Sequence, residues 1–103
     1  MLVHRIFCGL NSPQLTPDQA EQCVLDLILI HFPNGYTLHR SEGGWKDHRN
    51  PAELEIERSL IVEVWEVDGF DRPAYEAFAT DYKELGFQEC VAVLSAASEA
   101  ILF

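Results

Sequence analysis

One carboxylate stands out among the titratable side chains because of its neighbours. Glu63 lies between Ile61 and Trp65 in an apolar segment. Its carboxyl group therefore either loses solvation, which raises the pKa, or is matched by a cation such as Arg5 or Arg40. In the first case Glu63 could exchange protons with a substrate. We prefer the alternative, a cross-strand ion pair on an exposed or dimeric face, because ion pairs produce the same pattern.

A second group of chemically capable side chains lies within residues 39–49. Its main members are His39, Arg40, Trp45 and His48. Two histidines that titrate near neutral pH, beside an arginine, an indole and adjacent glycines, could form the mouth of a site, and His39 is our second catalytic candidate. The structural alternative is a solvated hairpin loop with its indole folded onto the sheet edge. We prefer this alternative because motif matches have many false positives.

Motifs for metal, phosphate or nucleophilic chemistry are missing from the sequence. It contains no Cys-x-x-Cys, no His-x-x-x-His and no glycine-rich phosphate loop. We therefore expect no metal and no cofactor, and we assign His4, His31 and the three cysteines to structural roles. An odd number of cysteines at no metal-ligand spacing favours a reduced compartment.

Length and charge limit the classes of partner. A chain of 103 residues with 48% hydrophobic content supports one ordered domain. The net charge is -10, and it is concentrated in the second half: residues 1–49 hold five acids and four bases, and residues 50–103 hold twelve and three. Such a field repels nucleic acid and anionic membranes, so we expect neither as a partner, while a basic protein remains open.

The N-terminus and the apolar run at residues 23–32 bear on location. The first residues lack the basic region and long apolar run of a signal peptide. Asp26 and His31 interrupt the later run, which is too short to span a membrane. We therefore expect a cytoplasmic protein.

The chain is predicted to be organised around a central strand at Leu60–Val67. A two-residue period places Leu60, Val62 and Val64 on one face and Glu63 on the other. A strand with one fully apolar face and one mixed face is expected near the middle of a sheet, with helices over the first face.

The other elements follow from caps, breaks and periodicity. One helix begins after Thr16, which forms a capping box with Gln19, and a second begins after Asp71 and stops at Gly86. Further strands are predicted at residues 3–10, 36–41 and 87–94, an exposed mobile connection at 46–55, a turn at 95–98 and a short fifth strand at 99–103. The order βαββαβ predicts a single α+β domain with a ferredoxin-like antiparallel sheet, both helices on one face, and the first and third strands central.

Several segments resemble a bacterial family known as a domain of unknown function. The family pattern combines aromatic-Pro-x-Gly-aromatic-Thr, a glycine–tryptophan turn, an Arg-Glu or Glu-Arg pair before a strand and a Gln-Glu-x-Val start to the last strand. The matching segments are Phe32 to Leu38, Gly44 to Asp47, Glu57 to Val62 and Phe87 to Val91. The resemblance spans most of the chain and implies a small α+β fold without implying an activity.

We expect a small acidic, non-catalytic interaction protein that forms a homodimer through the open sheet face around Ile61 and Trp65, which is too apolar for a free monomer. One alternative is an inhibitor of the phage or mobile-element type, acting as an acidic decoy for a basic nucleic-acid-binding site. Another is a small dimeric α+β-barrel enzyme that uses Glu63 and His39. The candidate binding residues are Trp65, Ile61, Arg40, Trp45, His48, Glu53, Glu55, Asp68 and Asp71.

The dimer is testable by mass. If a second copy covers the open face, light scattering is expected to give about twice the chain mass of 11.7 kDa. Trp65→Glu is expected to dissociate this dimer, because a charge buried without a partner is strongly unfavourable. A wild-type chain that stays monomeric at high concentration would contradict the prediction.

Overall fold

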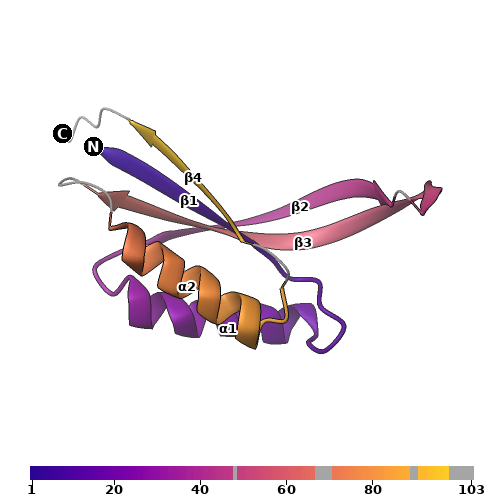
Figure 1. The fold of residues 1–103 in the computed structure, drawn as a ribbon, viewed down its shortest axis with the longest axis horizontal. Coiled ribbons are helices and arrows are strands. Elements are labelled where there is room, and N and C mark those ends of the chain that lie inside the picture. The colour runs from indigo at the N-terminus through magenta and orange to yellow at the C-terminus, as the bar shows by residue number, and fades with distance from the viewer. Residues whose placement is uncertain (48, 67–70, 89–90, 98–103) are drawn as a thin grey trace.

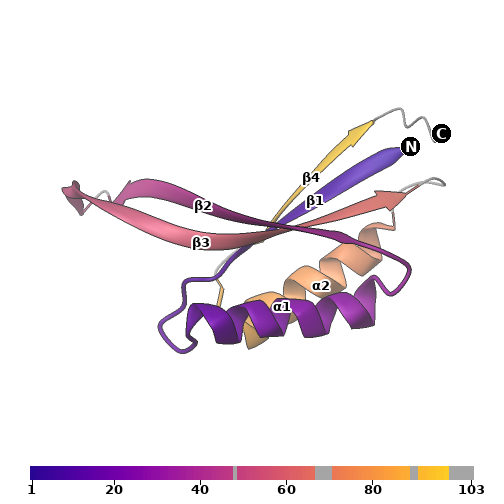
Figure 2. The same ribbon diagram turned by 180° about the vertical axis from the view of Figure 1, so that it is seen from behind.

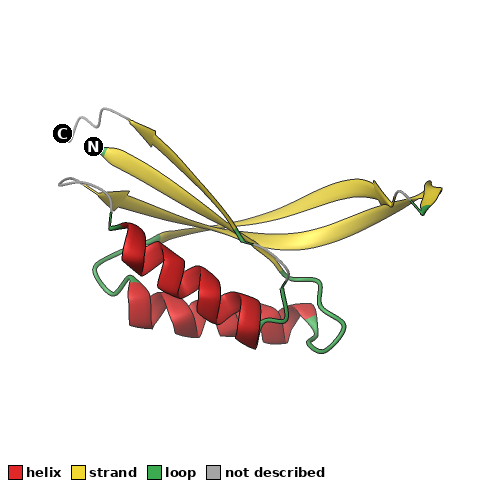
Figure 3. Ribbon diagram, viewed as in Figure 1, coloured by secondary structure: helices red, strands yellow, loops and turns green. Residues whose placement is uncertain are grey.

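The computed structural model describes residues 1–47, 49–66, 71–88 and 91–97. Within them, strands β1 (Leu2–Gly9), β2 (Thr37–Asp47), β3 (Asn50–Glu66) and β4 (Ala92–Ala97) form one antiparallel sheet in the order β2-β3-β1-β4. Helices α1 (Pro17–His31) and α2 (Arg72–Leu85) lie on the same face of that sheet (Figure 3). The predicted ferredoxin-like α+β arrangement is confirmed, with β1 and β3 central. The fifth strand predicted at 99–103 lies outside the described residues.

The helix starts form as their sequences predict. Thr16 Oγ1 accepts a hydrogen bond from the Gln19 backbone N–H at 3.2 Å, and Gln19 Oε1 accepts one from the Thr16 N–H at 2.9 Å, which completes the capping box. Asp71 Oδ1 accepts from the Ala74 N–H at 3.3 Å and caps α2, which ends at Gly86. In the first turn of each helix, a backbone N–H that has no partner within the helix therefore donates to the side chain of the cap residue.

The core lies between the two helices and the inward faces of β1 and β3. Ile6, Leu60 and Val62 are fully buried on the sheet side. Aromatic rings fill much of the space beside them: Phe32 lies 4.9 Å from Tyr75 and 5.6 Å from Phe78 between ring centroids. Figure 2 shows, from behind, that both helices run along one face of the sheet. The predicted inward face of β3 is confirmed.

The prediction of an exposed mobile connection at residues 46–55 is wrong. Backbone pairing of β2 and β3 continues through Ser41↔Ser59 and Lys46↔Leu54 to Asp47↔Asn50, so the segment belongs to a long hairpin. We call residues 42–57 the hairpin arm. The arm extends beyond the helices (Figure 1), and in its described part Leu54 and Ile56 are exposed. The glycines and charged residues of this segment suggest a loop, but its backbone pairs as a strand.

The last strand also begins later than predicted. It spans Ala92–Ala97 and not residues 87–94, so Ser95 lies in the strand and not in a turn. Ser95 is paired with His4 of β1, and Leu94 with Arg5. The small residues that suggest a turn are tolerated because β4 is an edge strand with one neighbour in the sheet.

The aromatic core makes a quantitative prediction on α2. Phe78 is 0% exposed, whereas Leu85, the last residue of the helix, is 56% exposed. Phe78→Ala is expected to lower the free energy of unfolding by about 3–5 kcal/mol through lost burial and a residual cavity. The control Leu85→Ala is expected to change it by less than about 1 kcal/mol. Urea denaturation of both variants measures the difference, and equal losses would contradict this core assignment.

Candidate functional site

Glu63 forms a polar centre on the open face of the sheet. Its side chain is only 10% exposed. Arg5 Nε donates to Glu63 Oε1 at 2.9 Å, Trp65 Nε1 donates to Oε2 at 2.8 Å, and His39 Nε2 lies 3.6 Å from Oε1. The structure thus contains the predicted cross-strand ion pair, with Arg5 as the cation. Arg40 instead lies 2.8 Å from Glu21 of α1, because its strand position points it toward the helices.

The donors around Glu63 set its protonation. The Trp65 hydrogen bond has the largest effect, and the hydrogen bond and charge of Arg5 and the charge of His39 act in the same direction, so the pKa of Glu63 is lowered despite the opposing effect of burial. The sequence left a raised pKa open, and the structure excludes it. Glu63 is consequently a fixed negative charge at neutral pH and a weak proton acceptor.

Two clefts meet at the indole of Trp65. One, of about 240 Å³, is lined by Glu63, Trp65, Tyr36 and Thr37 with the turn Asn34-Gly35. The other, of about 230 Å³, reaches from the same turn and Trp65 to Glu66 and Asp71. The turn depends on Gly35, whose φ of +143° is a conformation that other residues rarely adopt. Although its N–H is held by Glu63, the Trp65 side chain is 56% exposed, so its ring is accessible to a ligand.

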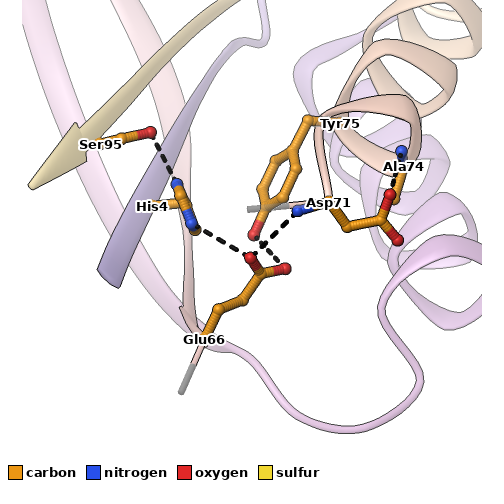
Figure 4. Close-up of polar contacts among 6 residues, drawn as sticks. All are labelled: His4, Glu66, Asp71, Ala74, Tyr75 and Ser95. Atoms are coloured by element: carbon orange, nitrogen blue, oxygen red, sulfur yellow. Dashed lines mark hydrogen bonds and ion pairs between the residues drawn. The ribbon is translucent and has the colours of Figure 1, made fainter. Parts of the chain in front are cut away.

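Glu66 forms a second polar centre on the helix-facing side of β3 (Figure 4). The Tyr75 hydroxyl donates to Glu66 Oε1 at 3.3 Å, and the Asp71 backbone N–H donates to Oε2 at 3.3 Å. His4 Nε2 lies 3.3 Å from Oε2, and His4 Nδ1 lies 2.6 Å from Ser95 Oγ. Burial, together with the Glu66 charge, raises the pKa of Tyr75, so its phenol remains a donor.

Sequence reasoning missed this second centre. His4 was assigned a structural role, and Glu66, Tyr75 and Ser95 were not singled out. The available signal was the period of the first strand, which places His4 on the same face as Ile6. A histidine on the buried face of a central strand needs polar partners, and an acid near the end of the paired strand is the expected one.

The remaining predicted site residues are dispersed. Ile61 is half-buried on the open face, and Glu53 and Glu55 are exposed on the hairpin arm. Asp71 both caps α2 and lines the second cleft. The backbone of Trp45 lies in β2 opposite Glu55, but its side chain, like the whole of His48 and Asp68, lies outside the described part. Residues 39–47 are therefore a strand that divides its side chains between two faces, and they do not form a loop around a site mouth.

The comparisons with known proteins place the chain in a family. Residues 4–102 match the family described as protein of unknown function (DUF3574), and the chain belongs to it, as the sequence motifs suggested. No curated protein matches the chain in sequence. In the described residues, no helix is long and apolar enough to cross a membrane, and no group of three or more His, Cys, Asp or Glu side chains is arranged to hold a metal.

Two solved structures share the fold. A phage SAM lyase in complex with S-methyl-5′-thioadenosine is 24% identical, with a TM-score of 0.63, covering 92% of this chain and 79% of that one. A phage SAM lyase in the apo state is 19% identical, with a TM-score of 0.59, covering 98% and 92%. At such identities the likeness establishes the fold alone.

This likeness contradicts our functional prediction. We predicted first a non-catalytic interaction protein, whereas the fold is shared with a lyase. The alternatives were an acidic decoy and a dimeric-barrel enzyme. The prediction relied on the absence of known motifs, and a site built from single residues on several strands leaves no local motif. The homodimer, the basic protein partner and the cytoplasmic location remain predictions.

The protonation of Glu63 predicts a pH-dependent stability. Because its pKa is lowered in the folded chain, ionised Glu63 stabilises the fold above its ordinary pKa of 4.5, and this contribution is lost as the pH falls through the lower folded-state value. Glu63→Gln is expected to lower Tm at pH 7 and to change it much less at pH 3.

The matched control for this pH series is Glu76→Gln, which removes a carboxylate from an exposed helical pair with Arg72. Exposed pairs contribute little to stability, so this variant is expected to melt close to wild type at both pH values. A Glu63→Gln deficit that is as large at pH 3 as at pH 7 would show a loss of packing and would contradict the electrostatic assignment.

Proposed function

We propose that this protein is a small lyase that binds a sulfonium nucleoside, such as S-adenosylmethionine, at the two clefts beside Trp65 and breaks a carbon–sulfur bond in it. The observation that carries the proposal is the ionised carboxylate of Glu63 beside the exposed side chains of Trp65 and Tyr36. The fold shared with a phage SAM lyase supports it.

The chemistry of the clefts suits the parts of such a ligand. An exposed indole and a phenol ring offer faces on which an adenine can stack, and an aromatic face also attracts a sulfonium cation. Glu63 adds a negative charge at the same wall. Arg5 and Trp65 each donate one hydrogen bond to its carboxylate, and both oxygens can still accept another. Each cleft is smaller than the roughly 300–1,000 Å³ of ordinary ligand sites. A nucleoside with an amino-acid arm would therefore occupy both.

The reaction needs no oxidant and no metal. The bond between the sulfonium sulfur and the γ-carbon of the aminobutyrate arm breaks, and its electron pair stays on sulfur, which leaves as the neutral thioether S-methyl-5′-thioadenosine. The γ-carbon is captured by the carboxylate oxygen of the same arm, which closes a ring and balances the atoms. This internal route matches the site, because a carboxylate with a lowered pKa is a weak base for the alternative, removal of a proton.

The role of Glu63 follows from the change in charge. A fixed anion stabilises the cationic substrate more than the neutral thioether product. Glu63 would therefore contribute to substrate binding and to product release, and contribute less to lowering the barrier of the step itself. The Trp65 N–H bond holds the indole in place for the ligand.

The test is incubation with S-adenosylmethionine, followed by chromatography of S-methyl-5′-thioadenosine. We expect the wild type to release the thioether without any methyl acceptor. Glu63→Gln keeps an oxygen for the Trp65 N–H and is expected to raise KM roughly three- to tenfold, as for the loss of one charge contact, with a smaller change in kcat. Inhibition by the neutral product is expected to change little.

Binding can be followed separately from turnover. The chain has two tryptophans, so Trp45→Phe leaves Trp65 as the only indole reporter, and S-adenosylmethionine is expected to quench its fluorescence. Glu76→Gln changes a carboxylate that lines neither cleft and is the matched charge control. A chain that neither cleaves S-adenosylmethionine nor responds to it at millimolar concentration would contradict the proposed function.

A further inference from the structure

A chain of polar contacts joins three strands on the helix-facing side of the sheet. Ser95 of β4, His4 of β1 and Glu66 of β3 follow one another, with 2.6 Å from Ser95 Oγ to His4 Nδ1 and 3.3 Å from His4 Nε2 to Glu66 Oε2 (Figure 4). The three residues come from distant parts of the sequence and meet because β1 lies between β3 and β4. A hydroxyl, an imidazole and a carboxylate in this order are the components of an activated serine nucleophile.

The acid and the base in this chain are held in place. Glu66 accepts hydrogen bonds from the Tyr75 hydroxyl and the Asp71 backbone N–H. His4 is 0% exposed, and its ring packs on Tyr75 with a centroid distance of 4.8 Å. A neutral ring with its proton on Nε2, on the side of Glu66, leaves Nδ1 to accept from the Ser95 hydroxyl. Catalytic contacts of this kind are commonly long before a substrate binds.

The serine, unlike the histidine, is accessible. Ser95 is exposed and lines a groove of about 340 Å³ between β4 and α2. The other lining residues are Arg72, Tyr75, Glu76, Ala79, Val91 and Val93. The groove thus offers aliphatic and aromatic contacts near the hydroxyl, and at its wall the exposed guanidinium of Arg72, which is paired with the Glu76 carboxylate at 2.7 Å. Such a surface suits a small apolar acyl group next to a polar or anionic portion.

We propose that Ser95, His4 and Glu66 form a second site that hydrolyses small carboxylic esters with an apolar acyl group. Ser95 Oγ attacks the acyl carbon while its proton passes to His4 Nδ1. The ester bond then breaks, and the leaving alkoxide takes that proton and departs as the alcohol. Water attacks the acyl-serine through the same base, which releases the carboxylic acid and restores the hydroxyl. Glu66 is a positioning residue that orients the imidazole and stabilises its charged form.

This site is distinct from the clefts beside Trp65, although Glu66 belongs to the site and also lines the second cleft. Ser95, Val91 and Val93 line only the groove at α2, and Glu63, Tyr36 and Thr37 line only the first cleft. The inference therefore does not rest on the proposed function. Cleavage of an ester without cleavage of S-adenosylmethionine would support the esterase site and contradict the proposed lyase function.

The experiment uses the full chain and two probes. A fluorophosphonate reacts with an activated serine by forming an O–P bond and releasing fluoride, and p-nitrophenyl butyrate reports ester hydrolysis by its coloured product. We expect one fluorophosphonate adduct per chain, mapped to Ser95 by peptide mass. Ser95→Ala is expected to abolish the adduct and to lower the rate of p-nitrophenyl release by about 100-fold or more. Because Ser95 is exposed, this variant is expected to fold.

A matched control and two further variants test the roles of the residues. Ser41→Ala removes another exposed strand serine, one whose hydroxyl lies 2.7 Å from Ser59 Oγ and not from a histidine, and is expected to leave both readouts unchanged. Glu66→Gln is expected to lower the hydrolysis rate by roughly tenfold or more, and Glu66→Asp, which keeps the charge, to restore part of it. Circular dichroism confirms that each variant is folded.

Two results would overturn the inference. The first is an unlabelled Ser95, or labelling of Ser95 no faster than that of Ser41. The second is a folded Glu66→Gln variant that retains the wild-type rate, because the imidazole would then need no orienting acid. Labelling confined to Ser95, together with a rate that depends on the charge at position 66, supports it.

Discussion

Packing of β1 and β3 against two helices is the constraint on which the other features depend. Once Leu60 and Val62 face the helices, the two-residue period of β3 decides the side of every later residue. Glu63 must then lie on the open face, and Glu66 must lie on the helix-facing side. The two carboxylates are three residues apart, yet they belong to different polar centres, and a shift of register by one residue would exchange them.

The two centres differ in what their surroundings do to a carboxylate. Glu63 has an arginine, an indole N–H and a histidine around it, and these donors hold it ionised in spite of its burial. Glu66 is held by a tyrosine hydroxyl and a backbone N–H, and it lies against a fully buried histidine. The first arrangement favours attraction of a cation. The second favours a fixed orientation of the His4 imidazole, on the opposite face of the same strand.

The hairpin arm shows how a polar sequence can form regular structure. Residues 52–57 alternate Ala, Leu and Ile with three glutamates, which is a strand period, but Leu54 and Ile56 are exposed, and the glycine-rich and charged residues before them favour a loop. The backbones of the two strands pair in register as far as Lys46 and Leu54, and the register shifts between Lys46 and Asp47. The last strand was placed too early for a related reason, since small residues such as Ser95 and Ala96 carry little β-propensity of their own.

The sequence by itself determined the elements with strong local signals. These are the capped helices at Thr16 and Asp71, the inward face of Leu60, Val62 and Val64, and the order that defines the ferredoxin-like sheet. It also favoured, without deciding, a cation beside Glu63. Only the tertiary structure decided which arginine that cation is, and only it brought His4, Glu66 and Ser95 together. The physical reason is that caps and periodicity act over a few residues, whereas these contacts depend on the register of strands that are distant in sequence.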